Sequence, residues 1–208
     1  MGWRCFRIEP TDLSRLSLRR FAYSSDAKAC PKGKGYGHDA SVVIADAVRE
    51  PPVRKGGKDG FDPDSRWPAK CTACSYVFQD GDQWQVNYEL LYKGAPDGKL
   101  YVLRESPPGA TWIADWFPDE GPNGQWTGPD GKVWCIMLPS GMEWIVYGHS
   151  SGPAKDQKGP KWTVQGVPPD VTVSPSIHQV GHYHGFIRGG IITEDCEGKK
   201  FPKWPPTA

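Results

Sequence analysis

The stretch QWQVNYELLYK, residues 83–93, decides the fold class. Every second residue from Trp84 to Tyr92 is apolar, and the residues between them are mostly polar. Side chains of a strand point alternately to its two faces, so a period of two indicates a strand with one apolar face. The stretch therefore predicts a β-strand that packs against a core through that face.

Turn motifs on the C-terminal side extend this strand into hairpins. The sequence APDG at 95–98 leads into LYVL at 100–103, and Pro-Asp-Gly recurs at 129–131 before VWCIML. The sequence PSG at 139–141 then returns the chain through MEWIVYG. Proline fixes φ, aspartate bonds to its own backbone and glycine permits positive φ, as tight turns require. We predict two hairpins here and three further strands within residues 162–192.

The N-terminal part has a different pattern. In residues 11–22, TDLSRLSLRRFA, Thr11 is a candidate N-cap, and Leu13 and Leu16 recur at helical spacing, so we predict a short helix. The apolar run SVVIADAV at 41–48 is too short to distinguish strand from helix. The fold class predicted is mainly β, with antiparallel hairpins or sheet and a short N-terminal helix.

Composition supports this fold class. The 208 residues include 25 Gly and 21 Pro, which argues against long helices, and ten Trp that can fill a core with few side chains. The length suits one domain, which we place at 1–208. Within it we expect a loop-rich zinc-knuckle region over 1–82 and a β-hairpin body over 83–208.

Charge disfavours some function classes. The formal net charge of +1 gives no overall attraction to phosphate, and the Trp-rich middle lacks a basic groove, so nucleic-acid binding is disfavoured. Residues 1–60 hold 12 Lys/Arg against 7 Asp/Glu, whereas residues 61–150 hold 6 against 12. Segments of opposite net charge favour contact with protein partners, including a second copy of the chain.

A metal site is predicted from the cysteines. Cys71 and Cys74 form a Cys-x-x-Cys pair, and a structural zinc ion needs four Cys or His ligands. Cys30 and His38, in the Gly-rich stretch CPKGKGYGHD, complete a Cys3His set. We therefore predict zinc ligation by Cys30, His38, Cys71 and Cys74, which would staple the loop region.

Other interpretations of the pair remain open. His184 and Cys196 could complete the site instead, or the pair could bind no metal. A redox role would place the pair at the start of a helix, but the following SYVFQDGDQW indicates a strand and a turn. Cys5 and Cys135 lie among apolar residues and are predicted to be buried small hydrophobes.

No catalytic motif is present. The sequence lacks His-Glu-x-x-His, Gly-x-Ser-x-Gly and P-loop patterns, so a non-enzymatic role is expected. The enzyme alternative is a metal-dependent hydrolase that uses His182, His184 and Asp195, with His178 nearby in the pattern H-x3-H-x-H.

The start MGWRCFRIEP lacks the apolar region of a signal peptide, and no apolar run reaches the length of a membrane span. We expect a reducing cytosol and no membrane association. In such a compartment six cysteines are better explained by metal or burial than by disulfides.

The whole chain, from GWRCFRIEPTD through RWPAKCTACSYVF and GPDGK to YHGFIRGG, resembles uncharacterised proteins of tailed bacteriophages. Its C-terminal part, with PSI, HGFIR and DC, is similar to a small family of predicted zinc-binding proteins encoded beside bacterial ubiquitin-like conjugation genes. That family has Cys directly before the His, where this chain has Tyr183 before His184. The first resemblance implies a phage product made in the bacterial host cytoplasm, which could also reside in the virion.

The function expected from the sequence is that of a zinc-stabilised structural or binding protein, a minor capsid or tail component of a phage. Its partners would be phage structural proteins or other copies of the chain. The alternatives are the hydrolase and an adaptor that binds a host protein.

Overall fold

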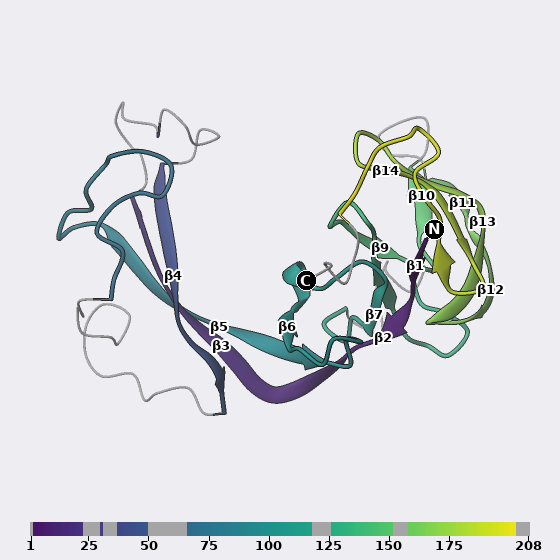
Figure 1. Cartoon of the computed structure of the whole chain (residues 1–208), viewed down its shortest axis with the longest axis horizontal. Helices are drawn as coiled ribbons and strands as arrows, with labels where there is room; N and C mark the ends of the chain where they lie inside the picture. Colours follow the sequence, from purple (N-terminus) through teal and green to yellow (C-terminus); the bar gives the residue numbers. More distant parts are fainter. Residues whose placement is uncertain are drawn as a thin grey trace. The chain divides into compact units, whose positions relative to one another are not determined.

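The structure is a computed structural model that describes residues 2–22, 30, 37–49, 66–117, 126–151 and 158–202. It divides into two compact units (Figure 1). Unit 1 comprises Met1–Pro10 and Tyr92–Ala208, and unit 2 comprises Thr11–Leu91. The sequence predicted a border between two regions after residue 82, where a strand begins. The structure places the end of unit 2 later, at Leu91 within that strand. That one domain spans 1–208 stays a prediction.

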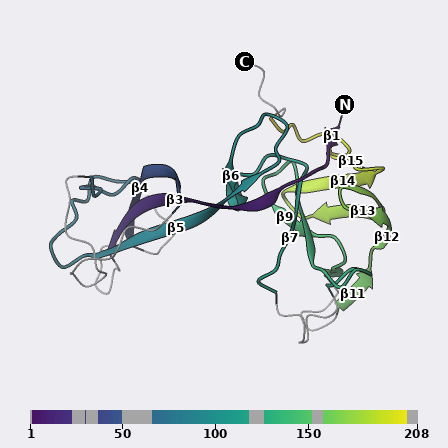
Figure 2. The same ribbon diagram turned by 90° about the horizontal axis from the view of Figure 1, so that it is seen from below.

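Unit 1 contains a five-stranded sheet in which all neighbours are antiparallel. Its first strand comes from the N-terminus and the others from the last quarter of the chain, and Figure 2 shows β13 and β14 side by side. The order is β1 (Trp3–Arg4), β15 (Ile191–Ile192), β14 (Tyr183–Arg188), β13 (Asp170–Gln179) and β12 (Thr163–Val167).

A second sheet of unit 1 is built around the predicted hairpin at 134–145. Its order is β2 (Phe6–Arg7), β7 (Ala110–Ile113), β8 (Trp134–Met137) and β9 (Glu143–Ile145); β2 and β7 are parallel and the other pairs antiparallel. A two-stranded ribbon joins β10 (His149–Ser151) and β11 (Lys158–Lys161). The predicted hairpin is thus confirmed. The three predicted C-terminal runs also form strands, but the last run, YHGFIRGGII, divides into two paired strands, β14 and β15.

Two buried clusters form the core of unit 1. One joins the two sheets through Trp134, Ile136, Val171, Ile177, Tyr183 and Ile187, and the other lies around Trp112 with Ile8, Tyr92 and Met137. The predicted burial of Cys5 and Cys135 is confirmed, since their residues are 3 % and 2 % exposed within these clusters. Burial raises the pKa of each thiol to about 12, so both stay protonated and inert.

Three long strands carry the third sheet. Its order is β4 (His38–Val48), β3 (Glu9–Ala22), β5 (Gln83–Lys93) and β6 (Tyr101–Val102), followed by the 3-10 turn η1 (Leu103–Glu105). β4 belongs to unit 2 and β6 to unit 1, whereas β3 and β5 continue from one unit into the other. The strand predicted at 83–93 is confirmed. The alternation of buried and exposed side chains breaks near its end, where Leu90 is 42 % exposed and Leu91 only 2 %.

The predicted N-terminal helix is wrong, because residues 11–22 belong to β3. Leu16 and Leu18 are buried, and so is Ser17 between them, which means that both faces of the strand are covered here. β3 pairs with β4 from Ser14 to Ala22 and with β5 on its other edge. These tertiary contacts outweigh the local signal of an N-cap and leucines at helical spacing.

The described residues contain no α-helix, and among them no helix is long and apolar enough to cross a membrane.

The turn after β5 makes Asp97 a pH-sensitive residue. The Lys99 N–H donates to Asp97 Oδ1 at 3.1 Å, and the Tyr101 hydroxyl donates to Oδ2 at 2.6 Å. Burial by itself raises the pKa of Asp97, but the hydrogen bonds from Tyr101 and Lys99 outweigh burial and hold it below its usual value. The ionised carboxylate therefore stabilises the folded turn.

We expect this contribution to be present above the unfolded-state pKa of about 3.9 and to disappear as the pH falls through the lower folded-state value. Asp97→Asn should therefore reduce the loss of unit 1 stability between about pH 5 and pH 2. Urea unfolding across this pH range checks it, with the exposed Asp115→Asn as the control. Equal acid sensitivity of wild type and Asp97→Asn would contradict the assignment.

Candidate metal centre

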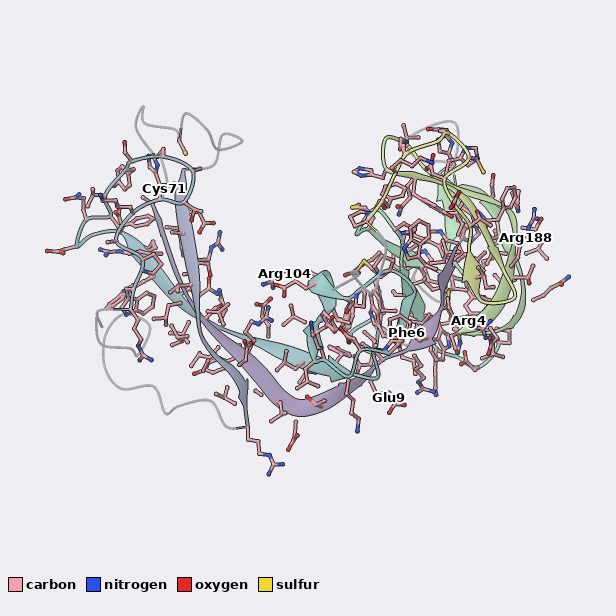
Figure 3. The ribbon with its side chains drawn as sticks, in the orientation of Figure 1. Arg4, Phe6, Glu9, Cys71, Arg104 and Arg188 are labelled. Atoms are coloured by element: carbon pink, nitrogen blue, oxygen red, sulfur yellow. The ribbon has the colours of Figure 1, made fainter. Side chains whose placement is uncertain are left out.

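The fold brings the four predicted zinc ligands together in unit 2. The side chains of Cys30, His38, Cys71 and Cys74 each offer a donor atom, and all four donor atoms lie within 4.8 Å of one another. His38 is the first residue of β4, and Figure 3 shows Cys71 in the loop beside the start of that strand. These residues, distant in the sequence, thus form a cluster that could hold a metal ion.

A short hairpin presents the Cys-x-x-Cys pair. Lys70 and Val77 form an antiparallel bridge, the Phe78 N–H donates to the Ala69 carbonyl at 3.0 Å, and the Cys71 N–H donates to the Tyr76 carbonyl at 2.9 Å. These bonds close the loop that contains Cys71 and Cys74. Its backbone geometry is therefore fixed by the hairpin itself.

A further hydrogen bond joins this loop to β4. The Thr72 N–H donates to the carbonyl of Asp39, the residue after His38, at 3.0 Å. The bond places the His38 ring next to the Cys pair, and the ring stacks on Tyr76 with centroids 3.9 Å apart and planes 5° apart. The stacked ring has little freedom to turn away from the sulfurs.

Two separations between donor atoms are close to those of a tetrahedral site. Cys30 Sγ and Cys71 Sγ are 4.0 Å apart, and Cys74 Sγ lies 3.2 Å from His38 Nδ1. Zinc bonds of about 2.3 Å to sulfur and about 2.0 Å to nitrogen at tetrahedral angles give ligand separations of about 3.8 Å for two sulfurs and about 3.5 Å for sulfur and nitrogen. The observed separations lie on either side of these values, so an ion fits with small side-chain shifts.

The cluster is largely shielded from solvent. Cys30, His38 and Cys71 are 3 %, 6 % and 6 % exposed, and Cys74 is partly exposed. No described residue pairs with the buried His38 Nε2. Three thiols and an imidazole packed against one another in such an interior have few partners other than each other, which is the chemistry of a metal site.

The Cys71 thiol is set up to ionise. Burial raises its pKa, but hydrogen bonds from the backbone N–H groups of Asp39 and Ala73, together with the His38 side chain, outweigh burial and lower the pKa to about 6. The thiolate is the form that binds metal. The lowered pKa of Cys71 therefore favours metal binding at neutral pH.

The Cys74 thiol differs from Cys71. The Tyr76 N–H points at Cys74 Sγ from 3.5 Å and by itself lowers the pKa. Burial and the neighbouring sulfurs of Cys30 and Cys71 act in the opposite direction, and the net pKa is raised. Without a cation the three sulfurs disfavour each other's ionisation, whereas a divalent cation at their centre would remove that penalty.

Two other interpretations of the Cys71–Cys74 pair, ligation with His184 and Cys196 and a redox role, are not favoured by the described residues. His184 and Cys196 belong to unit 1, and the four-residue cluster of unit 2 is complete without them. The pair sits in a hairpin, not at the N-terminus of a helix, so the geometry that activates a redox Cys-x-x-Cys is missing from these described residues.

The residues of the hydrolase alternative do not form one ligand set among the described residues. His182 is exposed in the turn between β13 and β14. The Asp195 carboxylate accepts hydrogen bonds from the backbone N–H groups of His184 and Glu197, so it stabilises the loop that contains Glu197. His184 instead lies with His178 and Glu197, a grouping that the sequence pattern did not indicate because Glu197 follows in a turn without periodic spacing.

Comparison with known proteins adds no relative. No protein-family model, no curated protein and no solved structure matches the chain.

Proposed function

We propose that the chain is a non-enzymatic structural or binding protein whose unit 2 is held in its fold by one zinc ion. The observation that carries the proposal is the buried cluster of four donor atoms within 4.8 Å, supplied by Cys30, His38, Cys71 and Cys74. A closed set of four protein ligands leaves no position for a substrate or a reactive water.

The donor set favours zinc over the other common metals. Three sulfurs and one imidazole nitrogen are soft or borderline ligands, which exclude magnesium and calcium, since these ions take oxygen ligands. Tetrahedral Cys3His coordination is a frequent structural zinc site. The ion itself would do no chemistry on a substrate here.

The part of unit 2 around the four ligands needs a metal ion to hold it together, although a second buried cluster of the unit, formed by Leu16, Leu18, Trp67 and Val86, does not include them. The buried cluster at the metal end consists of Ala22, Cys30, Ala40, Cys71 and Phe78, and two of these five residues are metal ligands. Three alanine-sized or aromatic side chains bury too little apolar surface to order two distant chain segments. Because the ligands meet only in the folded state, the free energy of zinc binding becomes folding free energy.

The proposed biological role is that of a minor component of a phage particle. It rests on the resemblance to tailed-phage proteins, and it is supported by the opposed charges of residues 1–60 and 61–150, which suit contacts with protein neighbours or with another copy. The zinc site would give one part of the chain a fixed shape for such contacts.

Particles of the phage that encodes the chain are expected to contain it in a fixed number of copies, because a structural component is incorporated stoichiometrically. Quantitative mass spectrometry of purified particles checks this, with the major capsid protein as internal reference. Absence from the particles, together with capture of one stoichiometric host protein by the tagged chain, would replace this role by that of a host-directed adaptor.

A further inference from the structure

We propose that unit 1 carries a second metal site, formed by His178, His184 and Glu197, which binds a divalent transition-metal ion and leaves coordination positions open. It is separate from the cluster of unit 2, because its three residues all belong to unit 1. Three protein ligands with open positions are typical of sites that hold water or a further ligand on the metal.

The strand register brings the two histidines together. His178 of β13 lies directly opposite His184 of β14 in the antiparallel pair. Their rings lie on the same face of the sheet and stack, with centroids 4.5 Å apart and planes inclined by 25°. Two imidazole rings side by side on neighbouring strands can each offer a ring nitrogen to the same ion.

Glu197 supplies the third ligand atom. Its Oε1 lies 3.3 Å from His178 Nε2 and 3.4 Å from His184 Nδ1. Direct charged hydrogen bonds are shorter, about 2.7–2.9 Å. Metal bonds of about 2.1 Å at angles between octahedral and tetrahedral place nitrogen and oxygen ligands about 3.0–3.4 Å apart, which matches both distances.

Two further polar atoms of this group, on His184 and Glu197, have partners that orient it. Ser176 Oγ lies 3.1 Å from His184 Nε2, and Lys199 Nζ donates to Glu197 Oε2 at 3.0 Å. These contacts leave His184 Nδ1 and Glu197 Oε1 facing each other. Partners on the far side of metal ligands fix ring orientation and tautomer, and their loss commonly weakens affinity by about 10–100-fold.

The loop that carries Glu197 is tied to β14. The Asp195 carboxylate accepts the N–H of His184 at 2.8 Å and the N–H of Glu197 at 2.8 Å, and the Cys196 N–H donates to the His184 carbonyl at 2.7 Å. These bonds hold the loop in register with the strand. Asp195, which the hydrolase alternative included, is therefore a positioning residue for Glu197.

The site is open to solvent, and one of its ligands borders a cleft. The side chains of His178, His184 and Glu197 are 47 %, 29 % and 44 % exposed, so an ion held by them reaches solvent. His178 also lines a cleft of about 540 Å³. The other walls of the cleft include Trp144, Trp162, His149, Lys161 and Ser176. The Lys161 ammonium and an open cation together favour an anionic ligand, such as a carboxylate or a phosphate.

Cobalt titration of the zinc-loaded full chain tests this site. Wild type is expected to bind one equivalent of Co²⁺ beyond its zinc, with the weak visible bands of nitrogen and oxygen ligation and without sulfur-to-cobalt charge transfer. His178→Ala, His184→Ala and Glu197→Gln should each abolish that equivalent or weaken it by at least about tenfold. His182→Ala is the matched control, since His182 is exposed in the adjacent turn outside the group, and it should bind as wild type does.

The surface positions of His178 and Glu197 keep the test interpretable if His184→Ala fails to fold, which thermal unfolding would reveal. Absence of the second equivalent in wild type at about millimolar Co²⁺ would overturn the proposal. So would a second equivalent that survives both His178→Ala and Glu197→Gln, or one that His182→Ala removes as well. Failure of this site leaves the zinc content of unit 2 unchanged, so the two proposals stand or fall separately.

Discussion

Removal of the proposed zinc ion by a strong chelator is expected to unfold the part of unit 2 around Cys30, His38, Cys71 and Cys74, while unit 1 keeps its fold. Structural zinc contributes an apparent 10–16 kcal/mol to small metal-dependent folds, roughly as much as the whole stability of an ordinary domain. The buried cluster that contains Cys30 and Cys71 has three other members, Ala22, Ala40 and Phe78, whereas the second buried cluster of unit 2, formed by Leu16, Leu18, Trp67 and Val86, contains none of the four ligands. Amide hydrogen exchange, read separately for β4 and for β13 and β14, measures the effect: protection should vanish at the His38 end of β4 and persist in β13 and β14.

Cys74→Ser should reproduce the effect of chelation, because a serine hydroxyl is a poor zinc ligand and three ligands remain. Elemental analysis of the purified variant is expected to show loss of the tightly bound zinc. The matched control is Cys196→Ser, an exposed cysteine outside the cluster, which should retain both the zinc and the protection of β4. Zinc retained by Cys74→Ser, or lost equally from Cys196→Ser, would contradict the assignment.

Trp112→Ala is expected to reduce the free energy of unfolding of unit 1 by about 3–5 kcal/mol. Trp112 is fully buried in β7, where it packs in the cluster that contains Ile8, Tyr92 and Met137. Its removal loses the buried aromatic surface and leaves a cavity that the surrounding strands cannot close. A loss of this size would consume a large fraction of the stability of a typical domain.

Trp116→Ala is the matched control, since Trp116 lies four residues further along and is 52 % exposed. The same chemical change there should alter stability by no more than about 0.5 kcal/mol. Urea unfolding followed by far-UV circular dichroism measures both variants. Similar losses for the two would show that the burial assigned to Trp112 is incorrect.

The parts of the fold that could be predicted from sequence are those with local signals. Alternation in residues 83–93 predicted β5, and turn residues at 139–141 predicted the β8-β9 hairpin. The Leu138 N–H donates to the Met142 carbonyl and the Gly141 N–H to the Leu138 carbonyl, both at 2.9 Å, and Gly141 has φ of 76°. The turn therefore forms as its own residues dictate.

Non-local pairing explains what the sequence could not predict. β1, at the start of the chain, pairs with β15 through Trp3 and Ile192. A local sequence pattern cannot predict pairing between strands that are so distant in the sequence. Residues 11–22 have a local helix signature, but pairing with β4 and β5 makes them a strand. Local preference is decisive only where tertiary contacts do not oppose it.

The metal cluster of unit 2 could be named residue by residue because cysteine and histidine spacing is a chemical signal independent of fold. The group at His178 could not be completed in this way. Glu197 carries no distinguishing pattern, and its place beside the histidines depends on the strand register and on the Asp195 loop.

Zinc-edge X-ray absorption of the purified full chain tests the central claim most directly, since it reports the elements around the ion. The structure predicts a shell of three sulfur atoms at about 2.3 Å and one nitrogen at about 2.0 Å, from Cys30, Cys71, Cys74 and His38. A protein without zinc, or zinc surrounded only by nitrogen and oxygen, would contradict it.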